Sequence, residues 1–288
     1  MLSRRNIRIK ILQVLFSQSL DPEVADKDVM ERYRSSVQLS YELYLFNLYL
    51  LVQVANQASK DAARRKAKYV SVQEDKLFSA KLLDNPCTDS LVNNNGLKAV
   101  FKFYGFEQKV DEDFAAKLYK GFAQDVDYVN YVLLPSENEQ HIEMLLKLYK
   151  HMIKDEYCTE VLDDHFNTWE DDESLVVGVM KKTIKSLPVG PHFYDEYKPE
   201  PEATIEFGEG MLRWILDNKQ NLLEIIKPTL ENWDADRVAI IDMNLIKMAV
   251  CEFLTCPSIP TKATLNEYVE ISKQYSTDKS KEFINGVL

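Results

Sequence analysis

The sequence predicts an all-α fold, and composition is the first reason. Only 8 of its 288 residues are glycine and 10 are proline, so few positions interrupt a long element. Leucine, lysine, glutamate and alanine, which favour helices, recur along the chain. We find no run of β-branched residues bounded by turns. With 45% hydrophobic residues, the chain has enough apolar mass for one large core or two smaller ones.

The first predicted helix starts after Ser3, a residue type that caps the amino termini of helices well. Apolar residues recur at helical spacing on one face: Ile7, Ile11, Val14 and Leu15. Arg4, Arg5 and Arg8 are three and four residues apart, so we expect them to project together from the opposite side. With Lys10, they give the first twenty residues four basic and no acidic side chains.

Helical patterns continue through the middle of the chain. A long helix is predicted from about residue 28 to residue 68, and turn-forming residues at 84–97 predict a loop. The next helices are predicted at 98–104, 111–134, 137–154 and 159–187. The proline-rich segment at 188–203 predicts a structureless linker.

Three helices are predicted near the carboxyl end. The first covers 240–253, and Asp234 or Asp236 is its predicted cap. Two prolines in "CPSIPTK" end it, and "ATLNEYVEISKQYS" predicts the second helix. Thr277 or Asp278 is the predicted cap of the last one.

A weak internal repeat relates two segments that are 64 residues apart. Residues 160–184 align with 224–248, which matches Trp169 to Trp233. Each copy predicts a helix, a turn and a second helix, and the first copy lies within 160–187. Duplication and chance resemblance between two amphipathic hairpins explain this alignment equally well.

Charge is distributed unevenly along a chain whose formal net charge is -11. The last segment, 203–288, holds nine basic and thirteen acidic residues, so most of the excess acid lies in the middle. Within that middle, "KDAARRKAK" at 60–68 is mixed. It predicts a solvated helix end whose cations complement the helix dipole, and a second nucleic-acid patch is the alternative.

The sequence favours a cytoplasmic protein. The amino-terminal apolar run lacks the features of a signal peptide, and the most apolar stretch, 41–54, is shorter than the roughly 20 residues that cross a bilayer. The four cysteines show no CxxC pair, so reduced thiols are expected. Zinc held by Cys251 and Cys256 is the alternative.

No catalytic motif is found. His141, His151 and His165 share a region with several acids, but no HExxH or paired ExxH spacing is present. Phosphate-loop, dinucleotide and nucleophile-elbow motifs are also absent. We therefore expect neither an enzyme nor a cofactor, a catalytic residue or a metal site.

Two stretches resemble one family. In the carboxyl-terminal stretch, "IPTKATLNEYVEISK" at 259–273 has the form IPxKxxxNExxExxK, and "FINGVL" ends the chain. At the start, "RRNIR" precedes "LQVLF". Both resemble the NusB family of bacterial transcription antitermination factors. The chain is about twice as long as an ordinary member and is similar to the long form of the Bacteroidetes.

The resemblance implies a NusB-like helical bundle of two three-helix-type subdomains, interrupted by a large helical insertion. Residues 1–20 and 203–288 are the expected RNA-binding domain, and 21–202 the insertion. The family is not enzymatic. It pairs with ribosomal protein NusE, and together they bind single-stranded boxA RNA in ribosomal RNA leaders, acting on the RNA polymerase antitermination complex. No membrane partner is implied.

Site residues follow from the same resemblance. The expected RNA contacts lie on the first and last helices: Arg4, Arg5, Arg8, Lys10, Asp278, Lys279, Ser280 and Phe283. The expected NusE contacts are Gln13, Phe16 and Glu209. A protein-interaction scaffold is the alternative function, with a structural NusB-like module and an insertion that binds another protein.

Overall fold

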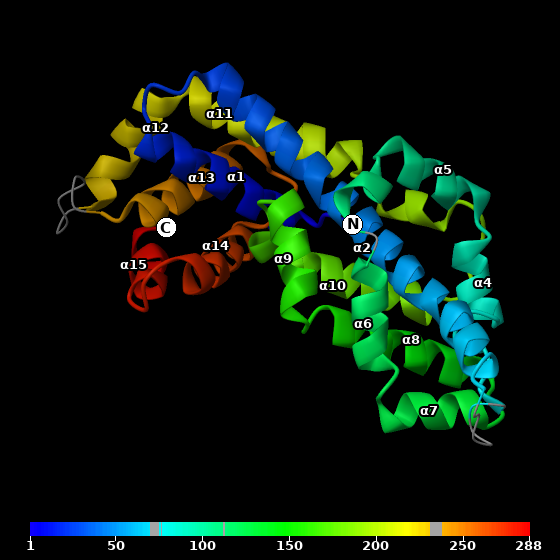
Figure 1. Cartoon of the computed structure of the whole chain (residues 1–288). Helices are drawn as coiled ribbons and strands as arrows, with labels where there is room; N and C mark the ends of the chain where they lie inside the picture. Colours follow the sequence, from blue (N-terminus) through cyan, green and yellow to red (C-terminus); the bar gives the residue numbers. More distant parts are fainter. Residues whose placement is uncertain (70–74, 76, 112, 231–237) are drawn as a thin grey trace. The chain divides into compact units, whose positions relative to one another are not determined.

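The computed structural model describes residues 1–69, 75, 77–111, 113–230 and 238–288. Every described element is a helix, so the all-α prediction is confirmed. The chain divides into two compact units (Figure 1). Unit 1 comprises Met1–Gln38 and Pro199–Leu288, and unit 2 comprises Leu39–Lys198. The division expected from the resemblance instead had its boundaries after residue 20 and before residue 203.

Unit 1 is built around the first helix. The π-helix η3 and helix α13 both pack against α1, and α14 and α15 pack on α13. Ser3 caps α1 as predicted, because its hydroxyl accepts from the Asn6 backbone at 3.3 Å. The elements of unit 1 are α1 (Arg4–Leu20), the start of α2 (Asp26–Lys66), η3 (Glu202–Glu209), α11 (Gly210–Asp217), α12 (Lys219–Ile226), the 3₁₀-helix η4 (Lys227–Leu230), α13 (Ile240–Thr255), α14 (Thr261–Tyr275) and α15 (Ser280–Val287).

Unit 2 surrounds the rest of α2, where residues 43–52 are all buried. That burial on every side explains the most apolar stretch of the sequence. Tyr149 of α8 donates to Asn47 of α2 at 3.0 Å, which satisfies a polar group inside this core. The other elements are α4 (Pro86–Val92), α5 (Asn95–Phe103), η1 (Phe106–Lys109), α6 (Phe114–Phe122), α7 (Val126–Leu133), α8 (Asn138–Met152), α9 (Glu156–His165), α10 (Trp169–Lys185) and η2 (Phe193–Tyr197), where η1 and η2 are 3₁₀-helices.

Several predicted bounds were wrong. The loop predicted at 84–97 contains α4, because Asn85 accepts from the Thr88 backbone at 3.0 Å and Pro86 fits the first turn. The helix predicted at 111–134 is two helices, with Asp125 capping α7. The helix predicted at 159–187 is likewise α9 and α10.

The predicted linker at 188–203 is not structureless. It contains η2, where the backbone carbonyl of Tyr194 accepts from the Tyr41 hydroxyl at 3.3 Å. The ring of Tyr197 also lies 5.0 Å from that of Tyr44. Aromatic burial against α2 therefore orders a segment whose prolines and acids predicted a linker.

The last two predicted caps have different outcomes. Asp234 and Asp236 lie outside the described residues, and α13 begins at Ile240 without a side-chain cap. The cap of α15 is Lys279, so neither predicted residue, Thr277 or Asp278, is the cap. Trp233 of the proposed repeat is also outside the described residues, so the duplication stays a prediction.

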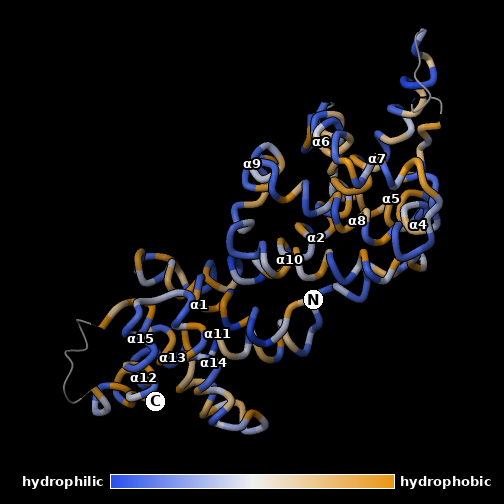
Figure 2. Tube along the Cα trace, turned by 90° about the horizontal axis from the view of Figure 1, so that it is seen from below, coloured by the Kyte–Doolittle hydropathy of each residue, from blue (hydrophilic) through white to orange (hydrophobic). Residues whose placement is uncertain are grey.

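Figure 2 shows hydrophobic and hydrophilic residues alternating along the helices of each unit. Within the described residues, no helix is both long enough and apolar enough to cross a membrane.

Candidate nucleic-acid interface

The start of α1 carries the predicted arginine cluster, but the fold separates its members. The side chain of Arg4 is 47% exposed, whereas that of Arg8 is only 5% exposed. Arg5 is half-buried, and Lys10 is buried. The prediction that three arginines share one exposed face is therefore wrong for Arg8.

Arg8 is held by a buried carboxylate on α13. Its Nε donates to Glu252 Oε2 at 2.8 Å, and its Nη2 donates to Oε1 at 2.6 Å. Glu252 also accepts from the hydroxyls of Thr264 at 2.8 Å and Tyr268 at 3.0 Å. Burial lowers the pKa of Arg8, but hydrogen bonding to Glu252 and the charges of Tyr268, Glu252 and Glu267 together raise it by more, so that pKa lies above its ordinary value. Arg8 is thus a structural cation.

An aromatic ring of η3 connects Arg8 with Arg4. The guanidinium carbons of Arg4 and Arg8 lie 5.6 Å and 5.2 Å from the centroid of the Phe207 ring. Cation–π attraction of this kind orients a guanidinium while it leaves edges free for other partners. Phe207 therefore positions the exposed Arg4 beside the buried Arg8.

Acidic residues from elsewhere in unit 1 approach the arginines. Arg4 Nη2 lies 3.5 Å from Glu202 Oε1, and Arg8 Nη1 lies 4.0 Å from Glu267 Oε2. On α14, the pKa of Glu270 is lowered mainly by its hydrogen bond with Lys273 and to a lesser degree by the charge of Arg5. The cations that stand alone in the sequence thus have acidic neighbours in the fold.

The predicted residues at the start of α15 also differ in accessibility. Asp278 and Lys279 are exposed, and Phe283 is half-buried. Ser280 is buried, and its hydroxyl donates to Asp242 Oδ2 at 2.8 Å. Ser280 therefore anchors α15 to α13. Because its side chain is buried, it is not accessible to RNA, which corrects the prediction for that residue.

The predicted NusE contacts lie on α1 and η3. Gln13 and Phe16 are half-buried on α1. Glu209, whose side chain is 12% exposed, accepts two hydrogen bonds from Arg34, at 2.8 and 2.7 Å. These hydrogen bonds hold the pKa of Glu209 below its ordinary value. Its carboxylate is therefore already occupied within unit 1.

Glycine at 208 allows η3 to approach α1 and α2 closely. A Cβ there would lie 1.8 Å from the Tyr33 hydroxyl and 2.9 Å from Ile7 Cγ2. That hydroxyl donates to the Thr204 backbone carbonyl in η3 at 2.9 Å. The close approach positions Phe207, and through it the exposed Arg4.

Sequence reasoning missed Glu252 and Phe207. Glu252 is four residues after Met248 and seven after Leu245, so it lies on the apolar face of α13 by helical spacing. An acid in that position needs a buried partner, and this pattern was the available signal. No comparable pattern in the sequence marks Phe207.

Neither a metal site nor a disulfide is found in the described part of the chain. No three histidine, cysteine or acidic side chains gather there to hold a metal ion. His141 instead lies 2.8 Å from the Tyr131 hydroxyl, and burial lowers its pKa. All four cysteines are free.

Comparison with known proteins gives one consistent result. The family model described as "NusB family" matches residues 143–288, which includes most of α8 and all of α9 and α10 of unit 2 but not α1. Proteins named "Transcription antitermination protein NusB" from Bacillus mycoides, Chloroherpeton thalassium and Listeria monocytogenes are 38%, 43% and 39% identical over 89, 74 and 83 residues. These alignments cover 31%, 26% and 29% of this chain and 68%, 35% and 65% of the relatives.

Proposed function

Because the chain belongs to the NusB family, we propose that it is a transcription antitermination factor that binds RNA and is not an enzyme. Its RNA is a single-stranded boxA-type element in ribosomal RNA leaders, which it binds together with ribosomal protein NusE. It acts through this complex on RNA polymerase. The names of the relatives support a role in antitermination, and binding of boxA RNA and of NusE is part of the proposal.

The exposed cation at the start of α1 is the observation that supports RNA binding most. Arg4 and its acidic neighbour Glu202 are both well exposed, at 47% and 75%. Exposed ion pairs of this kind contribute little stability, so a phosphate group can replace the acid at small cost. Arginine also contacts phosphate through two hydrogen bonds and stacks on unpaired bases. Arg4 and Arg5 are therefore the proposed RNA contacts of α1.

The exposed start of α15 supplies the proposed second part of the surface. Lys279 offers a cation, Asp278 a polar contact and Phe283 a partly accessible ring. Ser280 serves this surface indirectly, because its bond to Asp242 fixes the first turn of α15.

For NusE, the proposed contacts are Gln13, Phe16 and Glu209. Since Arg34 already occupies Glu209, that carboxylate would meet a partner only together with its arginine. The net charge of -11 suits a basic ribosomal partner.

The test is an RNA titration by fluorescence anisotropy, with and without NusE. It compares the wild type with Arg4→Gln/Arg5→Gln, and the matched control Lys98→Gln/Lys102→Gln removes two exposed charges from α5 of unit 2. Each phosphate contact on single-stranded nucleic acid contributes about -0.7 to the log–log salt slope. Loss of two contacts should thus flatten the slope by about 1.4 and weaken binding about tenfold at 0.1 M salt.

The control should bind boxA RNA as tightly as the wild type, and NusE should tighten both. If the wild type binds RNA no better than Arg4→Gln/Arg5→Gln, the proposed RNA site is wrong. That result would favour the scaffold alternative, in which the NusB-like module is only structural.

A further inference from the structure

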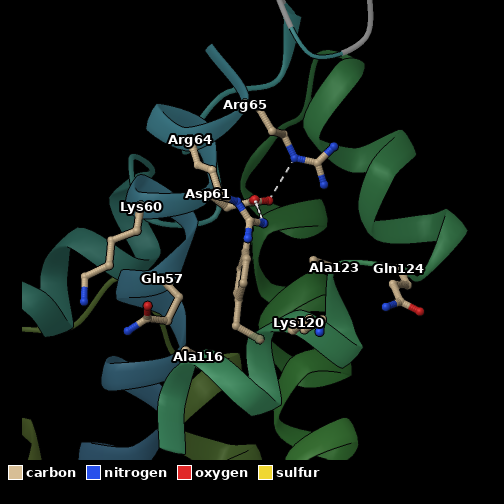
Figure 3. A pocket seen from close by; sticks show the side chains of 10 residues that line it. Gln57, Lys60, Asp61, Arg64, Arg65, Ala116, Lys120, Ala123 and Gln124 are labelled. Atoms are coloured by element: carbon tan, nitrogen blue, oxygen red, sulfur yellow. Dashed lines mark hydrogen bonds and ion pairs between the residues drawn. The ribbon is translucent and has the colours of Figure 1, made fainter. Parts of the chain in front are cut away.

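A pocket in unit 2 lies between the end of α2 and helix α6 (Figure 3). Its volume is about 410 Å³. Its charged and aromatic lining consists of Lys60, Asp61, Arg64 and Arg65 from α2 and Tyr119 and Lys120 from α6. Four cations and one acid therefore line one hollow of a chain that is strongly acidic overall.

The single acid of the pocket is already occupied. Asp61 is buried, and its two oxygens accept from Arg64 Nη2 at 2.5 Å and Arg65 Nε at 2.9 Å. Arg65 is further engaged, because its guanidinium lies 4.0 Å from the centroid of the Phe78 ring and 3.7 Å from Asp75. Asp61 thus orients two arginines and leaves the pocket with a positive charge.

Three exposed cations line the pocket, and two of them, Lys60 and Lys120, have no acidic partner among the described residues. Lys60 and Lys120 are exposed, and neither forms an ion pair with a described residue. The Arg64 side chain is 74% exposed although it contacts Asp61. Figure 3 shows that these three side chains come from two different helices around the same pocket. Their mutual repulsion favours a bound anion.

Complementing the helix dipole explains only part of this arrangement. Arg64 and Arg65 lie in the last turn of α2, and Lys120 lies in the last turn of α6. Lys60, however, is more than a turn before the end of α2, where the dipole favours no cation. A dipole effect also does not require the cations of two helices to line one pocket.

We propose that this pocket binds phosphate groups of an RNA backbone, as a second contact site in addition to α1. The inference rests on the proposed function for the choice of RNA. Arginine and lysine are the side chains that bind phosphate, and a positively charged groove is how proteins hold single strands without reading bases. The acidic remainder of the chain repels the phosphates of RNA, so a strand binds more favourably at a cationic pocket than elsewhere on the surface.

The test uses the full chain and single-stranded boxA RNA in fluorescence anisotropy. Lys60→Gln/Lys120→Gln removes two exposed lysines without disturbing Asp61, so folding is preserved, which circular dichroism verifies. Lys98→Gln/Lys102→Gln is the matched control in the same unit. We expect the pocket variant to bind RNA about tenfold more weakly at 0.1 M salt, with a salt slope flatter by about 1.4. The control should match the wild type.

Two further arms separate this inference from the proposed function. Arg4→Gln/Arg5→Gln tests the site on α1. If only the pocket variant loses RNA affinity, the result supports the pocket and refutes the site on α1. The second arm is calorimetry with inorganic tripolyphosphate. If tripolyphosphate binding depends on Lys60 and Lys120 but RNA binding does not, the pocket serves a small phosphorylated ligand and the RNA assignment is overturned. Equal RNA affinity of pocket variant and control, or a wild type that binds no RNA, also overturns it.

Discussion

The buried pair of Arg8 and Glu252 provides the sharpest test of the fold of unit 1. Arg8→Met removes the guanidinium but keeps most of the volume of its stem. Of its described side-chain partners, Glu252 then retains the hydroxyls of Thr264 and Tyr268, and its buried carboxylate has lost the cation that was bonded to it. We expect this variant to be strongly destabilised.

The magnitude follows from the bonds that are lost. Two hydrogen bonds to a charged group disappear, each worth about 1.5–3 kcal/mol. Removing one partner of a buried ion pair costs about 3–5 kcal/mol in comparable cases. The double variant Arg8→Met/Glu252→Met removes both charges of the buried pair, so it should recover most of that loss. Arg4→Met, at an exposed arginine one turn earlier, should change stability by no more than about 0.5 kcal/mol.

Hydrogen exchange measured by mass spectrometry is the suitable assay, because peptides from α13 and α14 report the opening of unit 1 by itself. A loss of about 3 kcal/mol corresponds to an exchange rate about a hundredfold faster in the most protected amides. If Arg8→Met exchanges no faster than Arg4→Met, Arg8 is not the buried partner of Glu252. Arg8 would then belong with the exposed arginines that are proposed to contact RNA.

Three other predictions concern single positions. Gly208→Ala should lower the free energy of unfolding of unit 1 by about 1–3 kcal/mol, because the new methyl group overlaps a buried tyrosine. Gly286→Ala in α15, where an added Cβ meets nothing within 4 Å, is the control and should not destabilise; equal losses in thermal melts would contradict the close approach. The pKa of Glu209 is lower in the folded chain than in the unfolded chain. Its contribution to stability is therefore present at a pH above the unfolded-state pKa, and it is lost as the pH falls through the folded-state pKa. Glu209→Gln should therefore show a smaller loss of stability than the wild type when urea unfolding is compared at about pH 6 and about pH 3, and parallel losses would refute this. Cys256 should be the thiol that iodoacetamide labels in the folded chain at neutral pH, because burial raises the pKa of Cys251 to about 12; labelling of Cys251 at a similar rate in mass spectra would contradict its burial.

Helical spacing in the sequence predicted most of the helices, and the errors have definite causes. The long helix predicted at 28–68 is confirmed as Asp26–Lys66. The missed helix α4 begins with Asn85 and Pro86, two residues that favour turns but equally favour a cap and a first helical turn. Composition could not distinguish these uses, because the choice depends on whether the following residues are buried.

The candidate interface was harder to predict, because its arrangement depends on contacts between distant residues. Arg8 and Glu252 are 244 positions apart in the chain. Spacing nevertheless held a clue, since Arg8 is four residues before Leu12 and seven before Leu15, both of which are buried. Counting the charges of the three arginines does not distinguish the buried, structural arginine from the exposed ones.

The division of the chain into two compact units has a spectroscopic consequence. Trp169 is buried in unit 2, while Trp214 and Trp233 fall within the sequence range of unit 1. Two-state unfolding is not assured for a chain with two compact units, and a single midpoint would average any difference between them. In a Trp169→Phe variant, tryptophan emission comes from unit 1 alone. Its difference from the wild-type emission curve then isolates unit 2, so the stability of each unit becomes measurable within the intact protein.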